Sequence, residues 1–206
     1  MSNFAFLPDD FRDIAESAVR AEGHVSGDPR AACFHARFAL EAAVHWLFRR
    51  DPALRMPYDD SLGALLHEPT FQNLLPQAVF QKARVIQRMG NRAVHDTRPV
   101  RPSDAMLAVK ELFHVCYWLT RTYAPGAVLP DAAWRDDRVP EARGGDAVPR
   151  AELEALEEKL AGQSRLALEE RRERDALDAE VRELRARLAE IRAASEAVPD
   201  MHDYSE

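Results

Sequence analysis

The sequence predicts an all-α fold, and three observations support that prediction. Apolar residues recur at helical spacing up to residue 124, and no segment alternates apolar and polar residues as a half-buried strand does. Helix-starting residues precede these segments, as at Asp28-Pro29. Pro and Gly become frequent after the last of them. We therefore expect a helical bundle over residues 1–124 and a linker or ordered strap over residues 125–149.

The expected helices of the bundle follow one another closely along the chain, and most begin at a capping or proline signal. One starts at Asp9-Asp10 and ends near Gly23, a long one runs from Asp28-Pro29 to Arg50, a short one starts at Asp60-Ser61, another runs from Pro76 to about Asp96, and the last is capped by Ser103-Asp104.

The carboxyl-terminal third predicts a long helix over residues 150–195. Its composition is Ala, Glu, Leu and Arg, and a 3,4 spacing of apolar positions runs from Leu153 to Ile191, as in a heptad seam. Gln163 and Arg174 fall on core positions of that seam and weaken it. Pairing with a second chain, folding back on itself, packing on a partner and existing as a single solvated helix all stay open.

Charge and cysteine usage exclude several classes of protein. The chain has 206 residues, 28 Lys and Arg and 35 Asp and Glu; 15 and 14 of these lie in residues 1–125, which leaves 13 and 21 for the rest. Bulk charge therefore does not indicate a nucleic-acid partner. Cys33 and Cys116 lack the spacing of a zinc site, and we expect both to be buried, reduced thiols. No signal segment or apolar run of membrane-spanning length occurs, so we expect a cytoplasmic location without membrane contact.

Residues 88–95, RMGNRAVH, carry the main candidate site. On a helix, Arg84, Arg88, Asn91 and His95 fall within roughly 60° of one another and form one polar edge. Gly90 lets a neighbouring element approach closely. Arg98 and Arg101 either join Arg84, Arg88 and Arg92 in a local basic surface or belong to a solvated loop.

A second polar stripe lies in the long helix that begins at Asp28-Pro29. Arg37, Glu41 and His45 recur there every four residues among apolar neighbours. Because a buried charge without a partner is costly, we expect Glu41 to pair with Arg37, Arg84 or Arg88. The two stripes then form one polar network in the core, made of Arg37, Glu41, Arg84, Arg88, Asn91 and His95.

Other residues with reactive or aromatic side chains have simpler explanations. We expect His35, His45 and His114 to be interior or boundary histidines whose hydrogen bonds are satisfied, because no carboxylate or thiol accompanies them at metal spacing. Trp46, Tyr117 and Trp118 fit a packed core better than a base-stacking platform.

The helix with Arg88 and His95 resembles that of the HEPN superfamily. Its ribonuclease members place Arg, a polar residue and His on one helix, with four to six residues between Arg and His. The resemblance implies metal-free RNA cleavage, in which His95 assists proton transfer from a 2′-hydroxyl and Arg88 steadies the phosphate, usually across a dimer interface. Here the polar residue Asn91 does not directly follow Arg88, which departs from the family pattern.

A second resemblance covers nearly the whole chain. Residues 2–7 (SNFAFL), the RMGNRAVH block, the linker and the Glu/Arg-rich coil resemble the amino-terminal region of type I restriction enzyme R subunits, where a HEPN-like domain precedes nuclease and motor domains. The resemblance implies that residues 196–206 begin the connection to those domains, and that ATP and magnesium belong there, with no cofactor in this stretch. The chain has no GxxxxGK[ST] loop and no paired-carboxylate nuclease motif.

Three hypotheses follow. The chain is a docking module for methyltransferase and specificity subunits or DNA in a complex that defends against foreign DNA, with self-association through the bundle or coil as a further option. Alternatively it is a HEPN ribonuclease acting through Arg88, Asn91 and His95. In the third, these residues are structural and tie the helices together, and burial of Asn91 and His95 would indicate it. We favour the structural role for these side chains and the docking role for the domain.

Overall fold

The computed structural model describes residues 1–95, 98–131, 133–141, 155, 158, 181–183 and 185–187, and the chain divides into two compact units, Met1–Glu157 and Glu158–Glu206. The described residues form helices, turns and loops without a strand, so the predicted all-α class is confirmed for them. The predicted coil over 150–195 meets the described residues only at short helical pieces, and 196–206 lies outside them. The coil and its connection therefore stay predictions.

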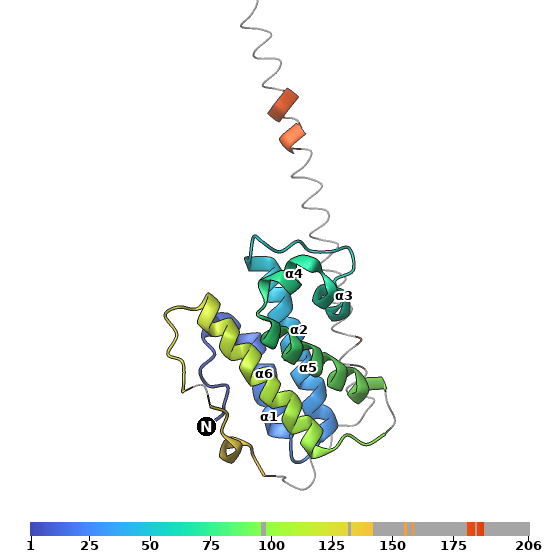
Figure 1. Ribbon diagram of the computed structural model, residues 1–206, viewed down its shortest axis with the longest axis vertical. Coiled ribbons are helices and arrows are strands. Elements are labelled where there is room, and N and C mark those ends of the chain that lie inside the picture. The colour runs from blue at the N-terminus through green and yellow to red at the C-terminus, as the bar shows by residue number, and fades with distance from the viewer. Residues whose placement is uncertain are drawn as a thin grey trace, which may run out of the picture. The chain divides into compact units, whose positions relative to one another are not determined.

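The bundle is built around one long central helix, α2 (Pro29–Arg50), which packs against α1 (Arg12–His24), α5 (Gln77–His95) and α6 (Pro102–Tyr123) (Figure 1). A short turn of 3-10 helix, η1 (Asp9–Phe11), leads into α1. α2 begins where its capping signal predicts. The Asp28 carboxylate accepts the N–H of Ala31 at 3.0 Å, and Pro29 occupies the first helical position, where its missing N–H costs nothing.

Two short helices, α3 (Leu62–His67) and α4 (Pro69–Leu74), lie at the end of the bundle where α2 ends (Figure 1). The Ser61 hydroxyl caps α3 as predicted, accepting the N–H of Ala64 at 3.3 Å. No pattern predicted α4. Its cap is Glu68, whose carboxylate accepts the N–H groups of Thr70 and Phe71. Glu is not among the usual capping residues, which explains why the sequence gave no signal there.

The observed start of α6 corrects the capping prediction for this helix. We expected Ser103-Asp104 to cap this helix, but α6 already begins at Pro102, with Arg101 at the cap position. Asp104 instead lies inside the first turn, where its carboxylate accepts two hydrogen bonds from the Arg101 guanidinium at 3.0 and 3.1 Å. A carboxylate in the first turn still stabilises the helix through its dipole.

One continuous apolar core joins α1, α2, α5 and α6. Its largest fully buried side chains include Phe4, Phe11, Phe71, Phe113 and Ile86. Cys33 and Cys116 are both fully buried free thiols, as predicted, and burial raises the pKa of each to about 12. Among the described residues no helix combines the length and apolar composition needed to cross a membrane.

Within the predicted linker or strap, the described residues 133–141 pack on the bundle, and we call these residues the strap. Asn3, in the amino-terminal segment, makes the polar contacts that hold this strap. The Asn3 side chain donates to the carbonyl oxygen of Arg135 at 2.9 Å and accepts the Arg135 N–H at 3.0 Å. Asn3 also donates twice to the buried Glu22 carboxylate of α1. Trp134 packs edge-on against Phe4 and Phe113, so the strap is held by both polar and aromatic contacts.

Candidate functional site

The polar edge of α5 faces solvent. The side chains of Arg88, Asn91, Arg92 and His95 are exposed, and we call these four residues the α5 face. Within the described part of the chain, no hydrogen bond or ion pair holds the side chains of Arg88, Asn91 or His95. A helical projection explains the orientation. Gly90, which contacts α2, lies roughly 130° around the helix from this edge.

This exposure corrects the predicted core network of Arg37, Glu41, Arg84, Arg88, Asn91 and His95. Arg37 and Glu41 of α2 do pair, with 3.8 Å between their nearest charged atoms, and both are largely buried. Arg84 is half-buried and its guanidinium lies 2.9 Å from Nε2 of His67, on α3. Arg88, Asn91 and His95 join no internal network, so the stripes of α2 and α5 remain separate.

Gly90 fixes how closely α2 and α5 approach, as its presence in the block suggested. A Cβ atom added at this position would lie 2.3 Å from Cβ of Arg37 and 2.7 Å from its Cδ. The stem of Arg37 therefore occupies the space that any other residue at position 90 would need. This contact sets the orientation in which α5 presents its exposed face.

The charge of α5 is uniform in sign. Its 19 residues contain Lys82, Arg84, Arg88 and Arg92 and no Asp or Glu, although the whole chain carries a net charge of −7. Lys82 points toward α6, where its ammonium contacts the Glu111 carboxylate at 2.5 Å. Arg84 is half-buried beside His67, whereas Arg88 and Arg92 are exposed.

Arg30 of α2 is part of this region, and the sequence patterns did not single it out. Its guanidinium donates to the carbonyl oxygen of Ala93 in the last turn of α5 and, at 2.9 Å, to that of Arg98 in the following loop. The last carbonyl groups of a helix have no partner within the helix and carry partial negative charge. Arg30 therefore satisfies and neutralises the carboxyl-terminal end of α5 beside His95.

The chemistry available on the α5 face is that of hydrogen-bond donors. Arginine offers a charged, planar fork of N–H groups that matches phosphate oxygens, asparagine adds amide N–H groups, and imidazole carries or releases a proton near neutral pH. No residue of α5 supplies a carboxylate. The arrangement suits the binding of an anion, and Arg88 with His95 adds the potential for proton transfer.

His35, His45 and His114, the three histidines expected at interior or boundary positions, are buried or half-buried. His35 is only 7% exposed, and burial next to His24 and Arg20 lowers its pKa to about 4. Burial also lowers the pKa of His45 and of His114. The interior or boundary positions of these histidines agree with the prediction. The expectation that their hydrogen bonds are satisfied is wrong for His45, because its Nε2 is buried and has no hydrogen-bond partner among the described residues.

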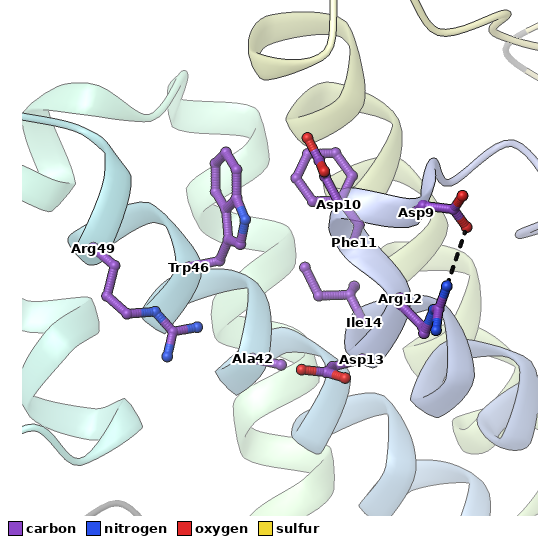
Figure 2. A pocket seen from close by; sticks show the side chains of 9 residues that line it. All are labelled: Asp9, Asp10, Phe11, Arg12, Asp13, Ile14, Ala42, Trp46 and Arg49. Carbon is purple, nitrogen blue, oxygen red and sulfur yellow. Dashed lines mark ion pairs between the residues drawn. The ribbon is translucent and has the colours of Figure 1, made fainter. Parts of the chain in front are cut away.

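A shallow hollow of about 140 Å³ lies between the start of α1 and the end of α2, and Figure 2 shows its lining. Trp46 and Arg49 of α2 face Phe11 and Ile14 across it, with Asp13 near its α2 wall. Trp46 also packs edge-on against Phe11 with ring centres 4.9 Å apart, which agrees with its predicted core role. No residue of α5 lines the hollow, so it is separate from the α5 face.

Comparison with known proteins identifies the family of this chain. Residues 19–161 match the family model described as a domain of unknown function, DUF4145. The chain belongs to the DUF4145 family. No curated protein and no solved structure matches it. The DUF4145 domain spans α2, α5 and α6 completely, so the α5 face lies inside it.

The DUF4145 domain offers no evident metal site in the part that the structure describes. Within those ranges, no three His, Cys, Asp or Glu side chains lie close enough together to share a metal ion. The candidate site of the DUF4145 domain is the α5 face, on which Arg88, Asn91, Arg92 and His95 are exposed.

Proposed function

We propose that this DUF4145 domain is a docking module of a DNA-restriction complex and contacts its partner through the α5 face. The setting is the one that the sequence resemblance implies, the amino-terminal region of the R subunit of a cytoplasmic type I restriction system that acts against foreign DNA. In this proposal the domain itself is not catalytic, and ATP-driven cleavage belongs to other domains of such a subunit.

One observation carries the proposal: the side chains of Arg88, Asn91 and His95 are exposed and make no hydrogen bond or ion pair within the described bundle. Exposed polar side chains on a rigid helix are available to a partner, whereas a structural role would require burial and internal partners. Gly90 and Arg30 hold the helix in place from the inside, so the face is presented in a fixed orientation.

The test uses the 206-residue chain and the methyltransferase–specificity complex of the same restriction system, with and without duplex DNA. We expect the chain to co-elute with that complex or with DNA, and the double variant Arg88→Glu/His95→Glu to lose this association. Arg12→Glu is the matched control, because Arg12 is 70% exposed on α1 and lies away from the α5 face. If the chain binds neither partner while a full-length R subunit binds both, the docking proposal is wrong.

A metal-independent ribonuclease is the second candidate function, and the exposure of both Arg88 and His95 favours it. The two side chains lie on the same side of α5, about two helical turns apart. In this alternative the imidazole of His95 accepts or donates the proton of a ribose 2′-hydroxyl while Arg88 binds the phosphate and Asn91 orients the substrate.

Incubation with single-stranded RNA in the presence of a chelator tests the ribonuclease alternative. Cleavage by the wild-type chain and its loss in His95→Ala, with no loss in His114→Ala on α6, would support it. Absence of cleavage, or equal cleavage by His95→Ala, excludes it.

A further inference from the structure

Charge and shape indicate which class of partner the α5 face binds. We infer that the α5 face binds the sugar–phosphate backbone of duplex DNA, with Arg88 and Arg92 on phosphate groups. This inference rests on the proposed function, because it names the partner of the same surface.

Charge complementarity is the first argument. α5 has no carboxylate, and the stretch from residue 76 to residue 101 contains six Lys and Arg against the single Asp96. Lys82 pairs with Glu111 and Arg101 with Asp104, so the exposed positive charge of α5 lies on Arg88 and Arg92. A localised basic face of this kind is the electrostatic footprint of a nucleic-acid partner, which bulk charge alone would hide.

The second argument concerns the end of the helix. The carboxyl terminus of an α-helix carries roughly half a negative charge, which would repel a phosphate placed near His95. Arg30 donates to the carbonyl groups of Ala93 and Arg98 and so covers this negative end with a guanidinium. The negative end of the helix dipole therefore does not oppose an anion at the last turn of the α5 face.

The third argument favours a duplex over a single strand. Proteins that hold single-stranded nucleic acid without sequence preference stack its bases on exposed aromatic rings. The only aromatic residue of α5 other than His95 is Phe80, which is partly buried against the core. Arg88 and Arg92 are separated by about 6 Å along the helix axis, which lets them reach neighbouring phosphates of one strand.

Phosphate contacts of this kind predict binding that is independent of sequence and sensitive to salt. Each neutralised phosphate releases counterions, so the logarithm of the binding constant falls with the logarithm of the salt concentration by about 0.9 per contact. The number of contacts that a variant has lost can therefore be read from the change in slope, which a general structural defect would not alter in this way.

The experiment measures binding of the 206-residue chain to a fluorescent duplex DNA of arbitrary sequence over a series of salt concentrations. The variants are Arg88→Gln and Arg92→Gln, and Arg12→Gln on α1 is the matched control. We expect each α5 variant to bind roughly threefold to tenfold more weakly at low salt and to reduce the slope by about 0.9, and the control to behave as the wild type. Circular dichroism and thermal melts verify that every variant is folded.

The outcomes separate this inference from the proposed function. If the wild-type chain binds no DNA, or if both α5 variants keep the slope of Arg12→Gln, the inference is overturned. The docking proposal survives that result when the Arg88→Glu/His95→Glu variant still loses the methyltransferase complex, and fails with it when the chain binds neither partner. Binding of single-stranded RNA in preference to duplex DNA, with loss in the same variants, also overturns the inference and favours the ribonuclease alternative.

Discussion

The polar stripes of α2 and α5 have similar sequences and opposite environments. Each repeats an arginine, a second polar residue and a histidine at intervals of three or four residues. In α2 the stripe is packed: Arg37 pairs with Glu41, and Nε2 of His45 is buried. In α5 the corresponding side chains Arg88, Asn91 and His95 are exposed. Spacing therefore tells which residues share a side of a helix, and the packing of neighbouring helices decides whether that side is core or surface.

The largest expected effect is a loss of stability on acidification, and it comes from the buried His35 rather than from the exposed His95. The folded-state pKa of His35 is about 4, below the value of 6.5 expected in the unfolded chain. Its neutral form is therefore favoured by folding. The resulting stability is complete above pH 6.5 and is lost as the pH falls from 6.5 toward 4, by an amount on the order of 3 kcal/mol.

Urea unfolding of the wild type and His35→Gln at pH 7.5 and pH 4.5 measures this effect. We expect the variant to lose less free energy of unfolding than the wild type on acidification. His95→Gln removes an exposed histidine and serves as the control. Equal acid sensitivity of the wild type and His35→Gln would show that burial of this imidazole does not influence stability.

The α2–α5 contact predicts the next effect. Gly90→Ala places a methyl group 2.3 Å from Cβ of Arg37, close to the backbone, where a rotamer change does not relieve the clash. We expect the free energy of unfolding to fall by about 1–3 kcal/mol, despite the better helix propensity of alanine.

Gly23→Ala in α1 is the matched control for Gly90→Ala. A Cβ at position 23 meets no atom within 4 Å. Helix propensity then acts alone and predicts a gain of up to about 1 kcal/mol. Thermal or urea unfolding distinguishes the two, and destabilisation of similar size in both would contradict the role assigned to the Arg37 stem.

The smallest effects are expected on the α5 face. Arg88→Gln, Asn91→Ala and His95→Gln should each change the free energy of unfolding by no more than about 0.5 kcal/mol, as is usual for exposed positions without partners. A loss of a few kcal/mol in any of them would restore the structural role that the sequence favoured. Unfolding measurements on these three variants therefore test the exposure of the face independently of any ligand.

Local chemistry determines several features that were therefore predictable. They are the helical class, the limits of α2 and α5, the end of α1, the start of α3 and the Arg37–Glu41 pair. Asp28 and Ser61 cap their helices through atoms three residues away, and Arg37 and Glu41 are neighbours on one helix. α4 was missed because Glu68 is an uncommon cap.

The outward orientation of Arg88, Asn91 and His95 was not predictable from the helix alone, because a polar edge fits both a buried network and a surface. Arg30 was missed for a related reason. Its carbonyl partners, Ala93 and Arg98, lie 63 and 68 residues away in the sequence, and helix spacing contains no information about such contacts.

The hydrogen bonds of Asn3 have a consequence for how the bundle unfolds. They join the third residue of the chain to Glu22 in α1 and to Arg135, which is 132 positions away. Loss of the amino-terminal segment removes both Asn3 donors from the buried Glu22 carboxylate, and loss of the strap breaks both hydrogen bonds between Arg135 and the Asn3 side chain. We expect this unit to open in a single cooperative step, with amide hydrogens of residues 3–4 and 134–135 exchanging at the same rate.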